Sequence, residues 1–165
     1  MDGLHASLRE TRNSLPENTR MQIIYLLNRL LGATIDLRAH AKQAHWNVRG
    51  PNFIALHKLF DEVAGVIDGF SDDLAERVAA LGGIALGTVQ VATKLTELKP
   101  YPADITGEKL HIEALSASLA IFAKAMRDSI ELSGNLGDTV TADLFTSMCR
   151  EAEKQLWLVE SHRLN

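Results

Sequence analysis

The sequence predicts an all-α fold, a four-helix bundle whose second and third helices are joined by one long crossover. Four long stretches repeat apolar residues at helical spacing, and Gly, Pro or capping residues separate them. The connections after the first and third stretches are short, whereas residues 84–105 separate the second from the third. Two helical hairpins linked across the bundle fit within the single domain that 165 residues favour.

The first helix is expected to begin at Ser14, because Ser14-Leu15-Pro16-Glu17 matches a capping box with proline in the first turn. The helix should end near Trp46, before Gly50-Pro51. Its apolar positions predict a buried face and include Ile23, Ile24, Leu27, Leu30 and Leu31. Residues 1–13 are then expected to form a flexible N-terminal tail, and residues 14–165 the bundle.

The second helix is expected to start near Asn52 and to stop at Gly82-Gly83. Its predicted core stripe consists of Phe53, Leu56, Phe60, Val63, Ile67, Phe70, Leu74 and Val78. The stripe beside it consists of His57, Asp61, Gly65, Asp68, Asp72 and Glu76. The helix therefore presents one face to the core and a neighbouring face rich in potential metal ligands.

The crossover is expected to hold a short helix at residues 89–95 and a break at residues 99–102, which include two prolines. A third long helix should run from about residue 106 to 133, where Gly134 marks its end. The fourth, capped by Asp138 or Thr139, should continue to near Ser161. One long crossover between two hairpins is typical of a ferritin-like bundle rather than a simple up-and-down one.

The composition favours a cytoplasmic globular protein. The richest apolar segment, residues 23–31, contains Asn28 and Arg29, so no membrane span is expected. Lys and Arg total 17 against 21 Asp and Glu, and this net charge of −4 gives no global electrostatic reason to expect nucleic acid binding. The lone Cys149 cannot form an intrachain disulfide, so a partly buried, inert thiol is expected there.

Two pairs of potential metal ligands lie on the polar stripe of the second helix. His57/Asp61 and Asp72/Glu76 are each spaced i,i+4, so each pair can offer two ligand atoms about 6 Å apart on one helix face. Asp61 and Asp72 share nearly the same azimuth but lie about 16 Å apart along the axis, too far for one ion to touch both pairs. An identical helix crossing antiparallel about a two-fold axis near residues 66 and 67 would bring opposite pairs together, giving two identical sites per dimer.

The residues between the pairs favour this arrangement. Gly65 and Gly69 lie near the proposed axis, and each costs about 1 kcal/mol relative to alanine in a helix, which close backbone approach would offset. From residue 61 to 76 there are six acids and no Lys or Arg, a repulsion that a bound cation would relieve. For His57/Asp61 taken alone, a solvated polar face is an equally good interpretation.

His45 is the third candidate histidine. It follows Leu27 by 18 residues, or five turns, so it shares the azimuth of the apolar face and should point inward or into an interface. Alone it would be interpreted as a hydrogen-bonded core histidine, but the short turn to His57 can bring the two imidazoles together. Imidazoles and carboxylates without a thiolate suit Fe(II), Mn(II) or Zn(II), and few protein ligands leave coordination positions open.

The segment Lys42-Gln43-Ala44-His45-Trp46-Asn47-Val48-Arg49-Gly50-Pro51-Asn52-Phe53, followed by His57-xxx-Asp61 and Asp72-xxx-Glu76, closely resembles the Dps family, the DNA-binding proteins from starved cells or mini-ferritins. The resemblance reappears within residues 81–88 and 156–161 and covers nearly the whole chain after residue 13. It implies a hollow homo-oligomer of twelve subunits. Such a shell oxidises Fe(II), preferably with hydrogen peroxide, and stores the ferric mineral, which protects the cell from oxidative damage.

The resemblance also implies a ferroxidase site shared across a two-fold dimer interface. His45, His57 and Asp61 would come from one chain, and Asp72 and Glu76 from its partner. Our hypothesis is that the two carboxylates anchor the first ferrous ion, while the other three residues hold the second ion or its water. Zinc or manganese could substitute for iron at such a site.

Two other functions compete with the ferroxidase. One is a nucleoid-associated structural protein that coats DNA with weak or no iron oxidation, and the other is a bundle whose acidic stripe serves only dimerisation. Residues 1–20 balance three Arg against three acids, and the first lysine is Lys42. Since DNA affinity comes largely from cationic groups, DNA binding is expected to be weak or absent.

Several residues outside these pairs also carry expectations. Glu108-x-x-His111 matches a di-iron motif, but only once where such bundles use two copies, so a solvated first turn is expected. Arg77 should be a structural ion-pair partner for an acid. Trp46 could quench one-electron leakage or serve only as a packing residue. The remaining histidines, His5, His40 and His162, are expected to lie at the surface or to be hydrogen bonded.

Overall fold

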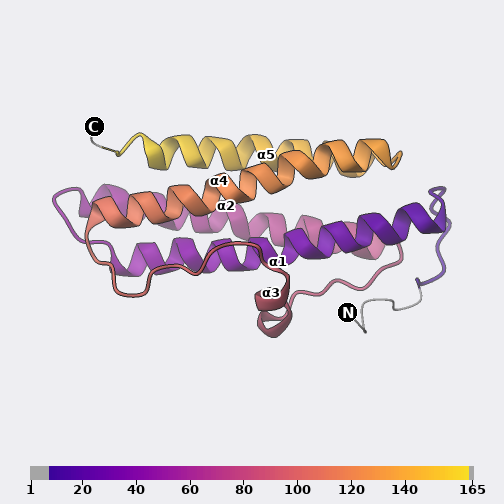
Figure 1. Ribbon diagram of the computed structural model, residues 1–165, viewed down its shortest axis with the longest axis horizontal. Helices are drawn as coiled ribbons and strands as arrows, with labels where there is room; N and C mark the ends of the chain where they lie inside the picture. Colours follow the sequence, from indigo (N-terminus) through magenta and orange to yellow (C-terminus); the bar gives the residue numbers. More distant parts are fainter. Residues whose placement is uncertain (1–7, 164–165) are drawn as a thin grey trace.

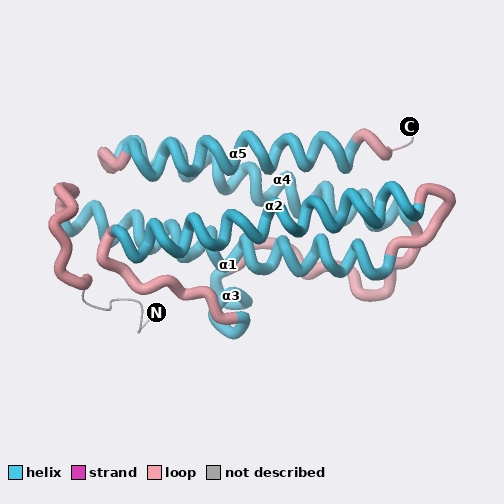
Figure 2. Tube along the Cα trace, turned by 180° about the vertical axis from the view of Figure 1, so that it is seen from behind, coloured by secondary structure: helices cyan, strands magenta, loops and turns pink. Residues whose placement is uncertain are grey.

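Residues 8–163 are described in a computed structural model of the chain. It contains α1 (Glu17–Asn47), α2 (Phe53–Ala80), α3 (Val89–Leu95), α4 (Glu108–Asn135) and α5 (Thr139–Glu160). The four long helices run side by side, with α1 against α2 and α4 against α5, while the short α3 lies outside the bundle against α1 (Figure 1). Figure 2 shows the same arrangement from behind. The predicted all-α bundle with a short helix in its crossover is confirmed.

One continuous core holds the helices together. On α2, the predicted stripe from Leu56 to Val78 is buried at every position, and only Phe53 is 38% exposed. Each fully buried Leu, Ile or Phe contributes about 1.5–3 kcal/mol relative to exposure. The largest side chains in this core are Phe60, Phe122 and Phe145, from α2, α4 and α5. Because the core anchors α2 along this stripe, its polar stripe is left facing outward.

Two helix ends differ from the sequence prediction. The capping box at Ser14 is wrong: α1 begins at Glu17, and Pro16 occupies the cap position without a side-chain cap. The Oδ1 of Asn13 instead accepts from the N–H of Leu15 at 3.0 Å and turns the chain into the helix. The α4 helix runs past Gly134 to Asn135, because the glycine that adopts a left-handed φ of +83° is Gly137.

The predicted cap of the last helix is confirmed. Asp138 precedes α5, and its Oδ1 accepts from the N–H of Thr141 at 3.0 Å. The end of α2 is likewise a glycine turn, since Gly82 has a φ of +86°. The turn at Gly82 therefore ends α2, and the cap at Asp138 begins α5. Arg77, near the end of α2, binds Asp138.

Side chains of α1 attach the crossover to the bundle. The buried Asn28 donates to the carbonyl of Ile84 at 3.1 Å and accepts from the N–H of Leu86 at 2.8 Å. At Gly32, an added Cβ would lie 2.7 Å from the Cβ of Leu95, so α3 lies directly on α1 because residue 32 has no side chain. The crossover therefore follows α1 closely on its way to α4 (Figure 1).

Most of the predicted N-terminal tail, residues 1–7, lies outside the described residues. The part that is described runs past the end of α2, where the N–H of Arg9 donates to the carbonyl of Gly82 at 2.8 Å. Within residues 8–163, no helix has both the length and the apolar character that a membrane crossing requires.

Candidate metal centre

His45 and His57 form a stacked pair where α1 ends and α2 begins. Their ring centroids are 3.8 Å apart, and the planes are inclined by 19°. The Nδ1 of His45 lies 2.7 Å from the carbonyl oxygen of His57, and the Nδ1 of His57 lies 2.9 Å from the carbonyl oxygen of His45. A carbonyl oxygen only accepts, so each Nδ1 carries a hydrogen, and Nε2 is the ring nitrogen left available to a cation. The pair therefore offers two nitrogen atoms as candidate metal ligands.

The turn between these histidines is held by the first residue of α4. The carboxylate of Glu108 accepts from the backbone N–H and from the side-chain amide of Asn52, both at 3.1 Å. Backbone hydrogen bonds join Arg49 to Thr106 and to Glu108 at 2.9 and 3.1 Å. Glu108 is therefore a structural clamp on this turn and keeps His45 and His57 in register.

Asp61 lies one turn after His57 on the same face of α2. Its Oδ1 accepts from the ammonium of Lys42 at 2.7 Å. This hydrogen bond is the main cause of the lowered pKa of Asp61; desolvation opposes it, and the positive charge of Lys42 adds to the lowering. The carboxylate is therefore ionised at neutral pH, with Lys42 as the counterion that a bound cation would have to displace.

Asp72 and Glu76 are exposed about three turns further along α2. Neither side chain forms a hydrogen bond or ion pair with any described residue. Asp72 borders an open groove of about 650 Å³ between α1, α2 and the start of the crossover, which Gly65 and Gly69 also line. Within residues 8–163, nothing outside this stretch of α2 lies within 4 Å of a Cβ built on either glycine. The described chain therefore leaves α2 open at Gly65 and Gly69, while Arg38 pairs with the neighbouring Asp68 at 2.8 Å.

The five predicted ligands thus fall into two groups. We call His45, His57 and Asp61 the imidazole half-site and Asp72 and Glu76 the carboxylate half-site. The spacing along α2 separates them by about 16 Å. Within residues 8–163, no three His, Cys, Asp or Glu side chains gather closely enough to hold a metal ion. One chain brings His45 and His57 together and leaves the carboxylates apart from them.

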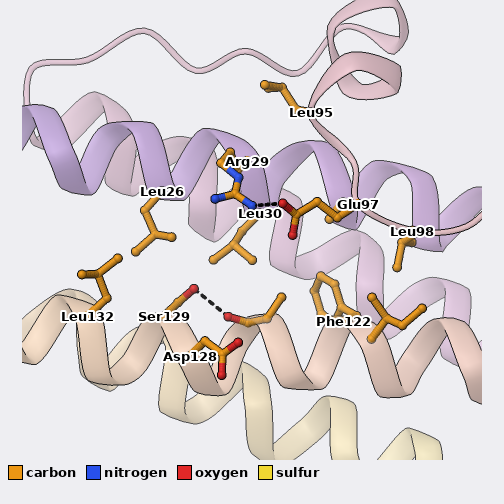
Figure 3. Close-up of a pocket in the computed structure, with 13 residues that line it drawn as sticks. Leu26, Arg29, Leu30, Leu95, Glu97, Leu98, Phe122, Asp128, Ser129 and Leu132 are labelled. Carbon is orange, nitrogen blue, oxygen red and sulfur yellow. Dashed lines mark hydrogen bonds and ion pairs between the residues drawn. The ribbon is translucent and has the colours of Figure 1, made fainter.

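The small cavity in Figure 3 is separate from these groups. It encloses about 180 Å³ between α1, the crossover and α4, and its walls are largely apolar, with Leu26, Leu30 and Phe122 among them. An ion pair between Arg29 and Glu97 lies on its lining. None of the predicted ligands borders it, so it is not a candidate for the metal centre.

Arg77 forms the structural ion pair that the sequence predicted. Its Nη2 donates to both carboxylate oxygens of Asp138 at 2.9 and 3.0 Å, and its Nε donates to the hydroxyl of Thr141 at 2.9 Å. Burial opposes ionisation of Asp138, but the hydrogen bonds from Thr141 and Arg77 outweigh it and hold the pKa below its usual value. This buried pair joins the end of α2, beside Glu76, to the start of α5.

The sequence prediction was wrong for His111. It was expected in a solvated first turn, but its side chain is 1% exposed because the crossover folds over the start of α4. The Nδ1 of His111 lies 2.9 Å from the hydroxyl of Tyr101, a crossover residue. Two other predictions are confirmed. His40 is buried and hydrogen bonded to Ser118 at 3.0 Å. Cys149 is buried, and this burial raises the pKa of its thiol.

Comparisons with known proteins cover almost the whole bundle. Residues 24–164 match the model of the ferritin-like domain. The chain is 43% identical over 153 residues to a "DNA protection during starvation protein" of Agrobacterium fabrum, covering 93% of this chain and 94% of that protein. A protein of the same name from Mycolicibacterium smegmatis is 32% identical over 148 residues, covering 90% and 80%.

Solved structures give the same result for the fold. DpsC from Streptomyces coelicolor superposes with a TM-score of 0.91 at 29% identity, covering 96% of this chain and 92% of that one. Mycobacterium smegmatis Dps gives 0.89 at 32% identity, covering 93% and 87%. The ferritin-like topology predicted from the long crossover is therefore confirmed.

Proposed function

This chain belongs to the Dps family of ferritin-like proteins, and on that premise we propose that it is a ferroxidase that stores iron. It would oxidise Fe(II), preferably with hydrogen peroxide, and retain the ferric product inside a hollow dodecamer in the cytoplasm. The observation that carries this proposal is the pair of imidazoles whose backbone hydrogen bonds leave both Nε2 lone pairs free. Two adjacent Nε2 atoms held in this way could bind one cation together.

The exposed face of α2 supports a site shared by two chains. The carboxylate half-site has no counterion among residues 8–163 of its own chain, and the groove beside it can receive another helix at Gly65 and Gly69. In an antiparallel arrangement, each carboxylate half-site would meet the imidazole half-site of the partner. Six such dimers would make the dodecamer, with twelve sites at the dimer interfaces.

Fe(II) enters this mechanism as substrate. Asp72 and Glu76 would hold the first ferrous ion, because two carboxylates offer the charge that a divalent cation needs and stabilise the ferric product. The Nε2 atoms of His45 and His57 would hold the second ferrous ion, together with Asp61 once Lys42 has moved away from it.

The two Fe(II) ions then give one electron each to hydrogen peroxide, which takes up two protons and leaves as two waters. No hydroxyl radical is released when both electrons transfer together. Zn(II) or Mn(II) would compete for the same ligands.

A complementation experiment tests whether the site is shared. One variant carries His57→Ala with Asp61→Ala, and the other carries Asp72→Ala with Glu76→Ala. Each shell alone should be inactive. With equal co-expression and random pairing, about half of the dimers are mixed and each mixed dimer regains one of its two sites, so these shells should recover about one quarter of the wild-type rate of Fe(II) oxidation. The rate is measured by stopped-flow absorbance of the ferric product.

The control for this experiment is a mixture of the two purified homogeneous shells, which cannot exchange half-sites. That mixture should stay inactive. If the co-expressed shells are equally inactive although both chains are present in them, the site is not divided between chains in the proposed way.

Protection of DNA is the competing function, because the names of the curated relatives refer to it. Residues 1–20 have no net charge, so we expect no shift of duplex DNA in a gel at physiological salt and only weak binding at low salt. Adding a lysine-rich segment to the N-terminus provides a positive control. Tight binding of the unmodified protein at physiological salt would favour a DNA-coating role.

A further inference from the structure

A partly buried tyrosine and two buried histidines form a group where the crossover meets α1 and α4. Tyr101 comes from the crossover, His111 from α4 and His40 from α1. The hydroxyl of Tyr101 is 2.9 Å from the Nδ1 of His111, and the tyrosine ring is 5.1 Å from the ring of His40, centroid to centroid. His40 already has Ser118 as its partner, so the tyrosine hydroxyl is directed at His111 alone.

The Tyr101–His111 hydrogen bond is polarised for transfer of a proton. Burial lowers the pKa of His111, so the imidazole is neutral at pH 7 and its Nδ1 can accept from the phenol. Burial raises the pKa of Tyr101, so the phenol keeps its proton. The backbone carbonyls of Ile105 and Asn47 favour the protonated form of His111, although its Nε2 is buried and forms no hydrogen bond within residues 8–163. A phenol with such an acceptor can lose an electron and its proton together.

The pair also lies close to the candidate metal centre. The carbonyl of Asn47, which contributes to the surroundings of His111, is only two residues after His45. His40 precedes His45 by five residues, or about 7.5 Å along α1 at 1.5 Å per residue. The C-terminal part of α1 therefore carries His45 and also borders the Tyr101–His111 pair through His40 and Asn47.

We propose that Tyr101, with His111 as its proton acceptor, is a one-electron relay that captures oxidising equivalents escaping from the iron site. This inference rests on the proposed function. When only one Fe(II) is present, it gives peroxide a single electron and leaves a hydroxyl radical. That radical takes one electron from Tyr101 and becomes hydroxide, while the phenolic proton moves to the Nδ1 of His111 and leaves a neutral phenoxyl radical. A second Fe(II) then reduces the phenoxyl radical, the proton returns from His111, and the balance is again two Fe(II) per peroxide.

Trp46 is less suited to this task although it is adjacent to His45. Its ring is 66% exposed, and the ammonium of Lys42 lies 5.8 Å from the ring centroid. The cation stabilises the neutral indole through its π face, and it would repel the radical cation that forms when the indole loses an electron. Tyr101 avoids this charge because its proton has an acceptor. The relay is therefore assigned to the partly buried phenol of Tyr101 rather than the exposed indole of Trp46.

The chain contains two tyrosines, which supplies a matched control. Wild type, Tyr101→Phe and Tyr25→Phe are mixed with substoichiometric Fe(II) and hydrogen peroxide, and frozen rapidly for electron paramagnetic resonance. A tyrosyl radical is expected in wild type and in Tyr25→Phe, which alters an exposed residue of α1. Tyr101→Phe keeps the ring but should abolish the signal, and a spin trap in solution should then capture several-fold more hydroxyl radical. His111→Gln should lower the radical yield while Tyr101 remains present.

A second measurement keeps this inference separate from the proposed function. Azide radicals generated by pulse radiolysis oxidise aromatic side chains in the iron-free protein, and phenoxyl absorbance is followed in the same three proteins. The phenoxyl radical should still form in Tyr25→Phe, where Tyr101 is the remaining tyrosine, and its yield should fall in Tyr101→Phe, whether or not the protein oxidises iron. A radical that Tyr25→Phe removes and Tyr101→Phe leaves unchanged would overturn the proposal. So would normal Fe(II) oxidation with the same spin-trap yield in Tyr101→Phe and wild type.

Discussion

Replacing both Asp72 and Glu76 with alanine is expected to nearly abolish peroxide-driven Fe(II) oxidation. Loss of even an indirect partner of a metal ligand typically costs about 10–100-fold, so removal of both direct ligands should lower the rate by about a hundredfold or more. The two side chains have no partner in the described part of their own chain, so their loss removes no intrachain interaction. The bundle should therefore keep its stability. The rate is followed by stopped-flow absorbance, with assembly checked by analytical ultracentrifugation.

A matched control is available on the same helix. Glu62→Ala with Asp73→Ala removes the same charge from exposed positions one residue away from the stripe. This control should retain most of the wild-type rate. If the rate of the Asp72/Glu76 variant equals that of the control, iron oxidation occurs elsewhere, and the acidic face of α2 has only a role in dimerisation.

The fold was largely predictable because helical periodicity records burial directly. The stripe from Leu56 to Val78 and the cap at Asp138 depend on residues within a few turns of each other. The start of α1 was less predictable, since two polar residues, Asn13 and Ser14, could each turn the chain. Asn13 does so, and the proline cap position leaves no role for Ser14 in capping. Short-range competition of this kind has no periodic signature.

The site was predictable only in part. The turn between α1 and α2 is short enough to predict that His45 and His57 meet. Their exchange of backbone hydrogen bonds, which leaves both Nε2 atoms free, depends on the angle between two helices and was not predictable. His111 was misjudged because its position in the first turn of α4 suggested exposure, whereas Tyr101 covers it from ten residues upstream. A crossover without periodicity gives no sequence signal for what it buries.

Arg77→Ala is expected to cause the largest loss of stability among substitutions outside the core. It leaves the carboxylate of Asp138, which is 1% exposed, without its guanidinium partner. Breaking a buried ion pair by removing one partner typically costs about 3–5 kcal/mol, because the other charge stays buried and unpaired. The free energy of unfolding is measured by denaturant titration at equal protein concentrations, since assembly also contributes to stability.

The pH dependence of this loss separates the ion pair from lost packing. Asp138 has a lowered pKa in the folded protein, so its stabilisation is present above the unfolded pKa and is lost as the pH falls through the folded one. The penalty of Arg77→Ala should therefore shrink in acid, where Asp138 is protonated in both proteins. Asp138→Asn in the Arg77→Ala background should recover part of the loss at pH 7, because the amide oxygen can still cap α5 without a charge.

Arg127→Ala provides the exposed counterpart on α4. Its ion pair with Glu153 has side chains 64% and 44% exposed, and such pairs contribute about 0–1 kcal/mol. If Arg77→Ala costs no more than Arg127→Ala, or if its penalty is independent of pH, the contact between α2 and α5 does not depend on the buried charge. The end of α2 beside Glu76 would then be positioned by apolar packing alone, and the carboxylate half-site would tolerate changes at Arg77 without loss of geometry.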